Sequence, residues 1–135
     1  MNVRLRYSTV FTAGIFYADQ LRMNNYQIKL HLTTNSEEGD DHNIALDRIK
    51  YFLHNQINST VFINSAEIDR CRVFSSAGIK ITTLPEEPLD QVIGIVLYCK
   101  LNAMLENRMI IDEVEICSEL GENIVYLHDE QEALG

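Results

Sequence analysis

The stretch IIDEVEICSELGENIVYLHD, residues 110–129, predicts that the chain closes with a β-hairpin. Polar and apolar residues alternate on both sides of a glycine-containing turn, which is typical of two half-buried strands. Side chains of the first strand then divide by parity between two faces. The even set is Ile110, Val114, Ile116 and Ser118, and the odd set is Ile111, Glu113, Glu115, Cys117 and Glu119. We interpret the acids mainly as a solvated face.

Two further strands are predicted near the N-terminus. Residues 3–11 and residues 26–33 each alternate between apolar and polar side chains. Because the two segments are close in sequence, an antiparallel pair is the natural arrangement. Residues 13–24 lie between them, and their pattern is compatible with a continued strand, a turn or a short helix.

Helical periodicity marks two segments between the outer strands. Residues 42–57 place apolar side chains on one stripe, and residues 89–105, which follow Pro88, are apolar over most of the circumference. Three shorter segments have weaker patterns. We interpret residues 58–64 as a strand fragment or a buried loop, residues 66–74 as a brief helix and residues 78–84 as a short strand.

The order of these elements predicts one α+β domain over residues 1–135. The order is strand, strand, helix, short helix and strand, long helix, strand, strand. We expect an antiparallel four-stranded sheet of the ββ-α-(α)-ββ kind, with two main helices on one face. The predicted strands carry side chains on two faces, and the second long helix is apolar over nearly its whole circumference. That is more apolar surface than one small chain easily buries, so we expect a homo-oligomer.

Composition excludes several classes of protein. The formal net charge is −9, and the 11 basic residues are scattered, which argues against a nucleic-acid partner. No apolar run approaches the length of a membrane span, and the N-terminus lacks an apolar signal core, so no membrane partner and a cytoplasmic location are expected. The three cysteines, Cys71, Cys99 and Cys117, have neither a disulfide-framework nor a zinc-site spacing.

No metal or other cofactor is predicted from the remaining polar residues. The four histidines, His31, His42, His54 and His128, lack the spacing of metal ligands. On the predicted sheet, His31 and His128 could approach one another or Glu115. The acids at residues 37–41 do not match a calcium loop.

Three segments resemble the pterin-synthase branch of the tunnelling fold, or T-fold, the superfamily of 6-pyruvoyl-tetrahydropterin synthase and 6-carboxy-tetrahydropterin synthase. They are FTAGIF (11–16), NNYQIKLHLTT (24–34), and the helix PLDQVIGIVLYCKLNAML (88–105) with its closing hairpin. The resemblance implies a T-fold oligomer with a ligand site. In that branch three histidines bind a catalytic zinc, and the matching positions here are Ile15, Arg22 and Asn24. The family's catalytic cysteine also has no counterpart before Cys71, so lyase chemistry is not expected.

The resemblance further implies a carboxylate near the hairpin turn that anchors a pterin or purine ring. Counting back from Tyr126 puts this position on Ser118, with Glu119 one residue away, so Glu119 and Ser118 are the predicted ligand-binding residues. A β-bulge at this point would favour a binding site, and a regular ladder would favour a fold that has lost one. We therefore expect a non-zinc T-fold-like protein that binds a purine- or pterin-like small molecule at a subunit interface. The alternative is a structural or protein-interaction module without catalytic activity.

Overall fold

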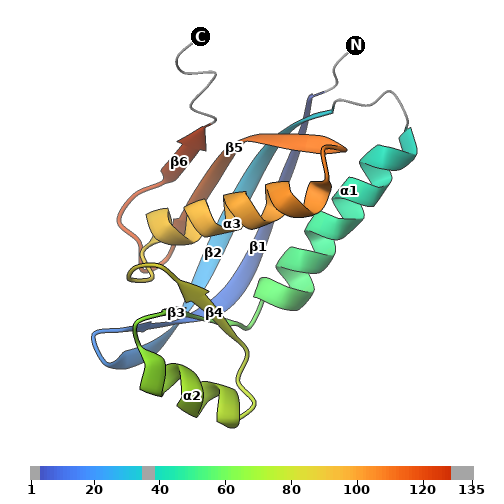
Figure 1. The fold of residues 1–135 in the computed structure, drawn as a ribbon. Coiled ribbons are helices and arrows are strands. Elements are labelled where there is room, and N and C mark those ends of the chain that lie inside the picture. The colour runs from blue at the N-terminus through green and yellow to red at the C-terminus, as the bar shows by residue number, and fades with distance from the viewer. Residues whose placement is uncertain (1–3, 35–38, 129–135) are drawn as a thin grey trace.

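The computed structural model describes residues 4–34 and 39–128, with backbone alone at 39–41. These residues form one mixed sheet with helices packed on it (Figure 1). The strands are β1 (Arg4–Tyr17), β2 (Gln20–Thr34), β3 (Val61–Asn64), β4 (Ile81–Leu84), β5 (Met109–Ser118) and β6 (Val125–His128). Their order across the sheet is β4-β3-β1-β2-β5-β6.

A single long hairpin forms the centre of the sheet. Strands β1 and β2 pair antiparallel from Arg4 opposite Thr33 to Tyr17 opposite Gln20. The turn consists of Ala18 and Asp19, with φ values of 51° and 62°. Two consecutive left-handed residues form a type I′ turn, whose twist matches that of the flanking strands. The undecided segment 13–24 is therefore a continuation of both strands.

The prediction of a four-stranded antiparallel sheet is wrong. Strands β3 and β4 add two more strands beside β1, and both pair in parallel, with Val61 opposite Gly14 and opposite Ile81. The short strand predicted at 78–84 contains β4, and β3 lies in 58–64, which the sequence left open between a strand fragment and a buried loop. Their place in the sheet depends on distant partners.

The two main helices share one face of the sheet, as predicted. Helix α1 (Gly39–Tyr51) continues into a π-helical segment, η1 (Phe52–Ile57), and α3 (Asp90–Leu105) crosses the sheet beside it (Figure 1). Ala45 and Ile49 of α1 join Leu97 of α3 and Ile28 of β2 in the main core. None of the described helices has the length and apolar character to cross a membrane.

The short helix α2 (Ile68–Ser76) packs apart from this core. Its residues Cys71 and Phe74 pack against Phe16, Val61 and Ile63, which form a second small cluster. Phe62, between Val61 and Ile63 on β3, belongs to the main core. Because neighbouring strand residues point to opposite faces, α2 covers the other face of the sheet at this end.

A β-bulge in β5 shows that the predicted division of β5 side chains between the two faces of the sheet is wrong for the residues before the bulge. The ladder between β2 and β5 shifts at His31 and Leu32, where Glu113 and Ile111 are the successive partners and Asp112 is the extra residue. Side chains before the bulge therefore change parity. Ile111 is fully buried together with Val114, although the alternation predicted that they point to opposite faces.

Candidate functional site

A cavity of about 360 Å³ opens where the β1–β2 hairpin passes the start of α3. Its walls come from three parts of the chain: the end of the hairpin, the segment that leads into α3, and the loop after β5. Apolar and polar groups both contribute. The lining residues are Ile15, Tyr17, Ala18, Gln20, Arg22, Asn24, Pro88, Leu89, Asp90, Ser118, Leu120 and Gly121.

Asp90, the first residue of α3, supplies a half-buried carboxylate to this cavity. The Ser118 hydroxyl lies 2.9 and 2.8 Å from its two oxygens and donates to them. Burial raises the pKa of Asp90 above its usual value, and the hydrogen bond from Ser118 opposes that shift. A carboxyl group with a raised pKa in a concave site is a marker of functional sites.

Gly121 lets the loop after β5 close over this carboxylate. A Cβ atom at Gly121 would lie 2.2 Å from Oδ2 of Asp90 and 2.8 Å from Oγ of Ser118. The Gly121 amide donates to Oγ of Ser118 at 3.0 Å, and the Leu120 amide donates to Oδ1 of Asn24 at 3.1 Å. The loop is thus held by the same polar side chains that line the cavity.

The Tyr26 hydroxyl is buried within reach of Asn24 and of the charge of Asp90, and it has no hydrogen-bond partner among the described residues, although Tyr26 itself does not line the cavity. Tyr26 is 1% exposed, and its oxygen is fully buried. Burial raises the pKa of Tyr26 well above its usual range, and the charge of Asp90 adds to this effect. Asn24 opposes the shift, although the two side chains do not reach hydrogen-bond geometry. A buried hydroxyl without a hydrogen bond carries a free-energy cost.

Arg22, whose side chain is exposed, supplies a cation to the cavity lining. Its Nε and Nη2 atoms donate to Oε1 of Gln20 at 3.2 and 2.8 Å. Among the described residues, Arg22 forms no ion pair with an acid. The charged side chains that line the cavity are therefore Arg22 and Asp90.

The two predicted ligand-binding residues lie on opposite faces of the sheet. Ser118 borders the cavity and also a second hollow, which the exposed Glu119 lines together with Val10 and Gln27. The ladder is regular here, with Ser118 opposite Tyr26 and the Glu119 amide donating to the Asn25 carbonyl at 3.1 Å. The bulge in β5 lies at Asp112 instead, so the regular ladder at Ser118 favours a fold that has lost the family-like anchor at this point. The ligand-binding role of both residues stays a prediction.

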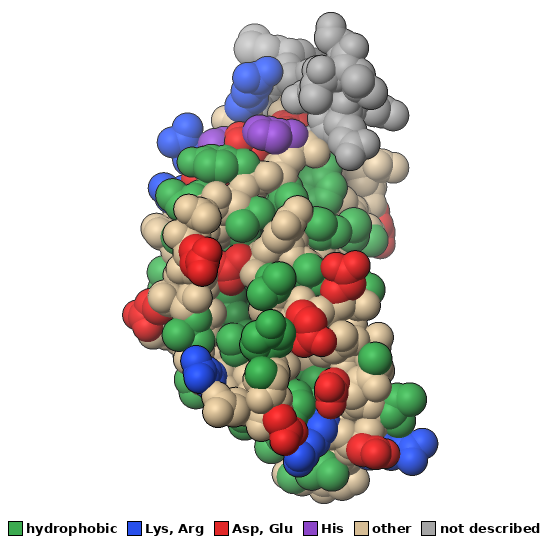
Figure 2. All heavy atoms as spheres, turned by 90° about the vertical axis from the view of Figure 1, so that its left-hand side faces the viewer, with side chains coloured by type: hydrophobic (Ala, Val, Ile, Leu, Met, Phe, Trp, Pro, Cys, Tyr) green, Lys and Arg blue, Asp and Glu red, His purple; other side chains and the backbone are tan. Residues whose placement is uncertain are grey.

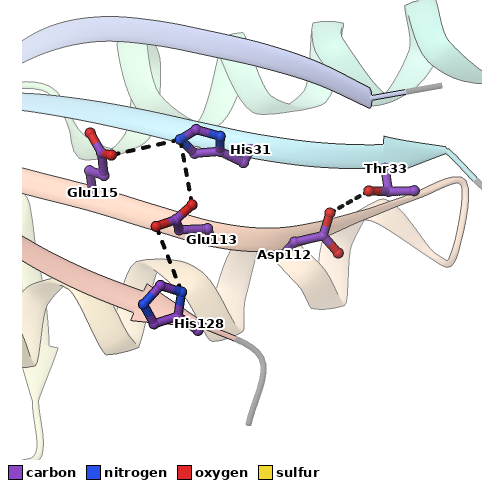
Figure 3. Close-up of polar contacts among 6 residues, drawn as sticks. All are labelled: His31, Thr33, Asp112, Glu113, Glu115 and His128. Atoms are coloured by element: carbon purple, nitrogen blue, oxygen red, sulfur yellow. Dashed lines mark hydrogen bonds and ion pairs between the residues drawn. The ribbon is translucent and has the colours of Figure 1, made fainter. Parts of the chain in front are cut away.

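A second polar cluster occupies the face of the sheet that α1 and α3 leave uncovered, on β2, β5 and β6 (Figure 3). Nε2 of His31 lies 3.8 Å from a carboxylate oxygen of both Glu113 and Glu115. Nδ1 of His128 lies 3.6 Å from the other oxygen of Glu113. His31 therefore approaches Glu115, as the sequence allowed, and meets His128 only through Glu113. Within the residues described, no group of three His, Cys, Asp or Glu side chains is arranged to hold a metal ion.

No protein-family model and no curated protein sequence matches this chain. Solved structures match it over nearly its whole length. A crystal structure of an uncharacterised protein from Wolinella succinogenes has a TM-score of 0.69 at 10% identity, covering 96% of this chain and 99% of that one. A catalytic-residue mutant of 6-pyruvoyltetrahydropterin synthase from Plasmodium vivax has a TM-score of 0.61 at 14% identity, with 96% and 98% covered.

This chain has the tunnelling fold. The Plasmodium falciparum 6-pyruvoyl tetrahydropterin synthase also matches, with a TM-score of 0.53 at 12% identity over 95% of this chain and 99% of that one. At such identities the likeness is one of fold. The resemblance read from the sequence is thus confirmed at that level.

The T-fold places the three positions that match the family's zinc ligands on the wall of the cavity. Ile15, Arg22 and Asn24 all line it. They do not fit a zinc ion, because isoleucine has no donor atom, the arginine guanidinium is cationic, and Oδ1 of Asn24 accepts from Leu120. The chemistry of this cavity therefore rests on a carboxylate, a guanidinium and neutral hydrogen-bonding groups.

Asp90 lines the cavity, but sequence reasoning did not select it. It follows Pro88 at a helix start, where an acid is commonplace because the helix dipole favours it. Its proximity to Ser118, 28 residues along the chain, depends on how α3 crosses β5.

Proposed function

We propose that this T-fold chain binds a small heterocyclic molecule of a purine- or pterin-like kind in the cavity at the start of α3. The observation that carries the proposal is the half-buried carboxylate of Asp90, which lines this cavity and accepts the hydroxyl of Ser118. A carboxylate accepts two N–H donors from a guanine- or pterin-like ring edge. The apolar side chains of Ile15, Tyr17 and Leu89 supply contact surface for the ring.

The cavity is proposed to lie at a contact between copies of the chain. Leu89 and Leu120 line it, yet they are 57% and 48% exposed. A second copy that covers these side chains would remove apolar surface from water and close the cavity around a ligand.

A ligand panel on matched variants tests the proposed site. We expect guanosine nucleotides or oxidised pterins to raise the melting temperature of the wild type, because a ligand that binds the folded state stabilises it. Asp90→Asn should lose most of this rise, since an amide nitrogen replaces one acceptor oxygen. Asp69→Asn, at an exposed site in the first turn of α2, is the control and should behave as wild type. Equal shifts in all three proteins would refute the role of Asp90.

The substitution Glu119→Gln distinguishes between two possible ligand sites: the cavity with Asp90, and the Glu119 carboxylate that the resemblance implies as the ring anchor. The Glu119 side chain faces away from the cavity within one chain, so ligand binding should survive this substitution. Loss of binding in Glu119→Gln, with Asp90→Asn unaffected, would instead put the ligand on the opposite face of the sheet.

A structural or protein-interaction module is the second candidate function. It is favoured by the bonds that Ser118 and Asn24 accept from the loop after β5, and by the bond from Ser118 to Asp90. If these side chains only hold the loop, no ligand in the panel will shift the melting temperature, and Asp90→Asn will alter the loop's amide exchange alone.

A further inference from the structure

We propose that a hollow on the sheet face that α1 and α3 leave uncovered is a second ligand site, which takes a phosphate group through Arg4 and Arg6. The hollow has a volume of about 540 Å³ and lies at the end of the β1–β2 hairpin away from the turn. Its charged and titratable lining residues are Arg4, Arg6, His31, Asp112, Glu113 and His128. The inference is independent of the proposed function, because the described residues that line this hollow and the cavity are different ones.

Strand pairing brings these side chains into one row across the sheet. Arg6 lies opposite His31 on β2. His31 lies opposite Glu113 on β5, and Glu113 lies opposite His128 on β6. Arg4 precedes Arg6 by two residues, so both side chains leave β1 on the same face, with Cα atoms about 7 Å apart. The strands therefore present two guanidinium groups and two imidazoles to one hollow.

Each of the two acids in the hollow lies beside a donor from the chain itself (Figure 3). Asp112 accepts a hydrogen bond from the hydroxyl of Thr33. One carboxylate oxygen of Glu113 lies 3.8 Å from Nε2 of His31, and the other lies 3.6 Å from Nδ1 of His128. The chain thus places its own polar groups around the acids of the hollow and leaves the guanidinium groups to a ligand.

The two guanidinium groups form a site because they converge, not because each lacks an acid. A lone exposed arginine such as Arg72 is no evidence of a site. Within the described part of the chain, Arg4 and Arg6 line one hollow and their side chains form no hydrogen bond or ion pair. Each guanidinium donates two parallel hydrogen bonds to a phosphate or a carboxylate. A phosphate between them suits the pair better, because it carries up to two negative charges and three acceptor oxygens.

The charge of the whole molecule limits the size of the ligand. The formal net charge is −9, so the protein as a whole repels an anion, and attraction must come from Arg4 and Arg6 at short range. A longer anionic chain would extend from the hollow onto a surface with an excess of acids. The site is therefore expected to take a single phosphate or a diphosphate, alone or on a small organic molecule, rather than a nucleic acid.

Isothermal titration calorimetry at low salt tests the site with inorganic phosphate, pyrophosphate, glycerol 3-phosphate and acetate. We expect one phosphate ligand per chain, bound at least about tenfold more tightly than acetate, which has one charge and fewer acceptor oxygens. Pyrophosphate and glycerol 3-phosphate distinguish a free diphosphate from a phosphate on an organic molecule. The affinity should fall as the salt concentration rises, because salt screens exposed charges. In amide NMR spectra the ligand should shift the signals of Arg6 and His31.

Variants locate the source of the affinity. Arg4→Gln and Arg6→Gln should each weaken binding about tenfold, and the variant with both substitutions should lose it. Arg6→Lys should retain part of the affinity, because the charge remains without the bidentate geometry. Glu113→Gln should bind more tightly, since it removes a repelling charge from the hollow. Arg72→Gln, at an exposed position on α2, is the control and should bind as wild type.

Three outcomes would overturn the inference. The first is the absence of binding by either phosphate ligand or pyrophosphate at millimolar concentration. The second is binding that persists in the variant with both arginine substitutions. The third is an equal loss in Arg72→Gln and Arg6→Gln, because net charge alone would then account for the affinity. The melting temperature of each variant, measured without ligand, checks that the fold is intact.

Discussion

At the scale of single residues, Asp90 combines a structural contact with an electrostatic cost. Its carboxylate accepts the Ser118 hydroxyl and lies against Gly121, and burial raises its pKa. An acid whose pKa is higher in the folded state than in the unfolded chain binds its proton more tightly when folded. Its contribution to stability is therefore present at low pH and is lost as the pH rises through the folded-state pKa.

Asp90→Asn should reveal this cost as a pH dependence. The variant keeps one oxygen for Ser118 but cannot ionise. The free energy of unfolding of the wild type, relative to that of Asp90→Asn, should fall as the pH rises above the ordinary value of 3.8 and level off once Asp90 is ionised in the folded state. Urea unfolding of both proteins over a pH series measures it, with Asp69→Asn as the exposed control. A relative stability of the wild type that instead rises through this range would contradict the raised pKa.

At the scale of elements, the turn between β1 and β2 positions the rim of the cavity. Tyr17, Ala18 and Gln20 all line it, and the turn holds Ala18 and Asp19 at positive φ. Alanine in the left-handed region carries a steric cost that asparagine partly avoids. Type I′ turns accordingly prefer asparagine or glycine at this place.

Ala18→Asn should stabilise the protein by about 0.5–1 kcal/mol, because part of the left-handed cost is removed. The measurement is the free energy of unfolding in urea. Ala103→Asn, on the exposed side of α3, is the matched control and should destabilise by roughly 0.5 kcal/mol through its poorer helix propensity. If both substitutions had the same sign, the hairpin turn would not have the type I′ conformation that we describe.

Another element-scale contact is the close packing of α3 on the last strand. Gly94 lies in the buried part of α3, where a Cβ atom would come within 2.9 Å of Cδ1 of Leu127 and 3.1 Å of Cγ2 of Ile116. A glycine inside a helix costs about 1 kcal/mol relative to alanine, and here that cost permits the close approach. The start of α3, with Asp90, is thereby held against the end of β5.

At the scale of the whole molecule, the sheet has two free edges and exposed apolar side chains beside one of them. Strand β6 lies at one edge and β4 at the other. Ile124 and Tyr126 are each 52% exposed, and Leu120 is 48% exposed. The view of the β6 side shows apolar groups interspersed with acids, with few Lys or Arg side chains among them (Figure 2). Unpaired edges of this kind favour pairing with another chain.

We therefore predict that the chain forms a homo-oligomer that uses the β6 edge. Tyr126→Lys should shift the sedimenting species toward monomer, because it puts a charge into the proposed contact. Tyr51→Lys, at a residue 58% exposed near the end of α1, is the control and should leave the assembly unchanged. Sedimentation velocity of the three proteins measures this. A monomeric wild type, or equal dissociation in both variants, would refute it.

The sequence by itself determined the elements whose evidence is local. Period-two alternation identified β1, β2, β5 and β6, and helical periodicity identified α1 and α3, because both periods follow from backbone geometry within one segment. The resemblance matched Ile15, Arg22 and Asn24 to the positions of the family's zinc ligands, as departures from them, and all three line one cavity.

Only the tertiary structure decided the features that depend on distant partners. Strands β3 and β4 join the sheet through parallel pairing, and the extra residue at Asp112 exists only relative to β2. The hydrogen bond between Ser118 and Asp90 also depends on distant parts of the chain. The same holds for the Tyr26 hydroxyl, which has no hydrogen-bond partner among the described residues. Burial and hydrogen-bond satisfaction are properties of the packed molecule, and no periodicity in a single segment encodes them.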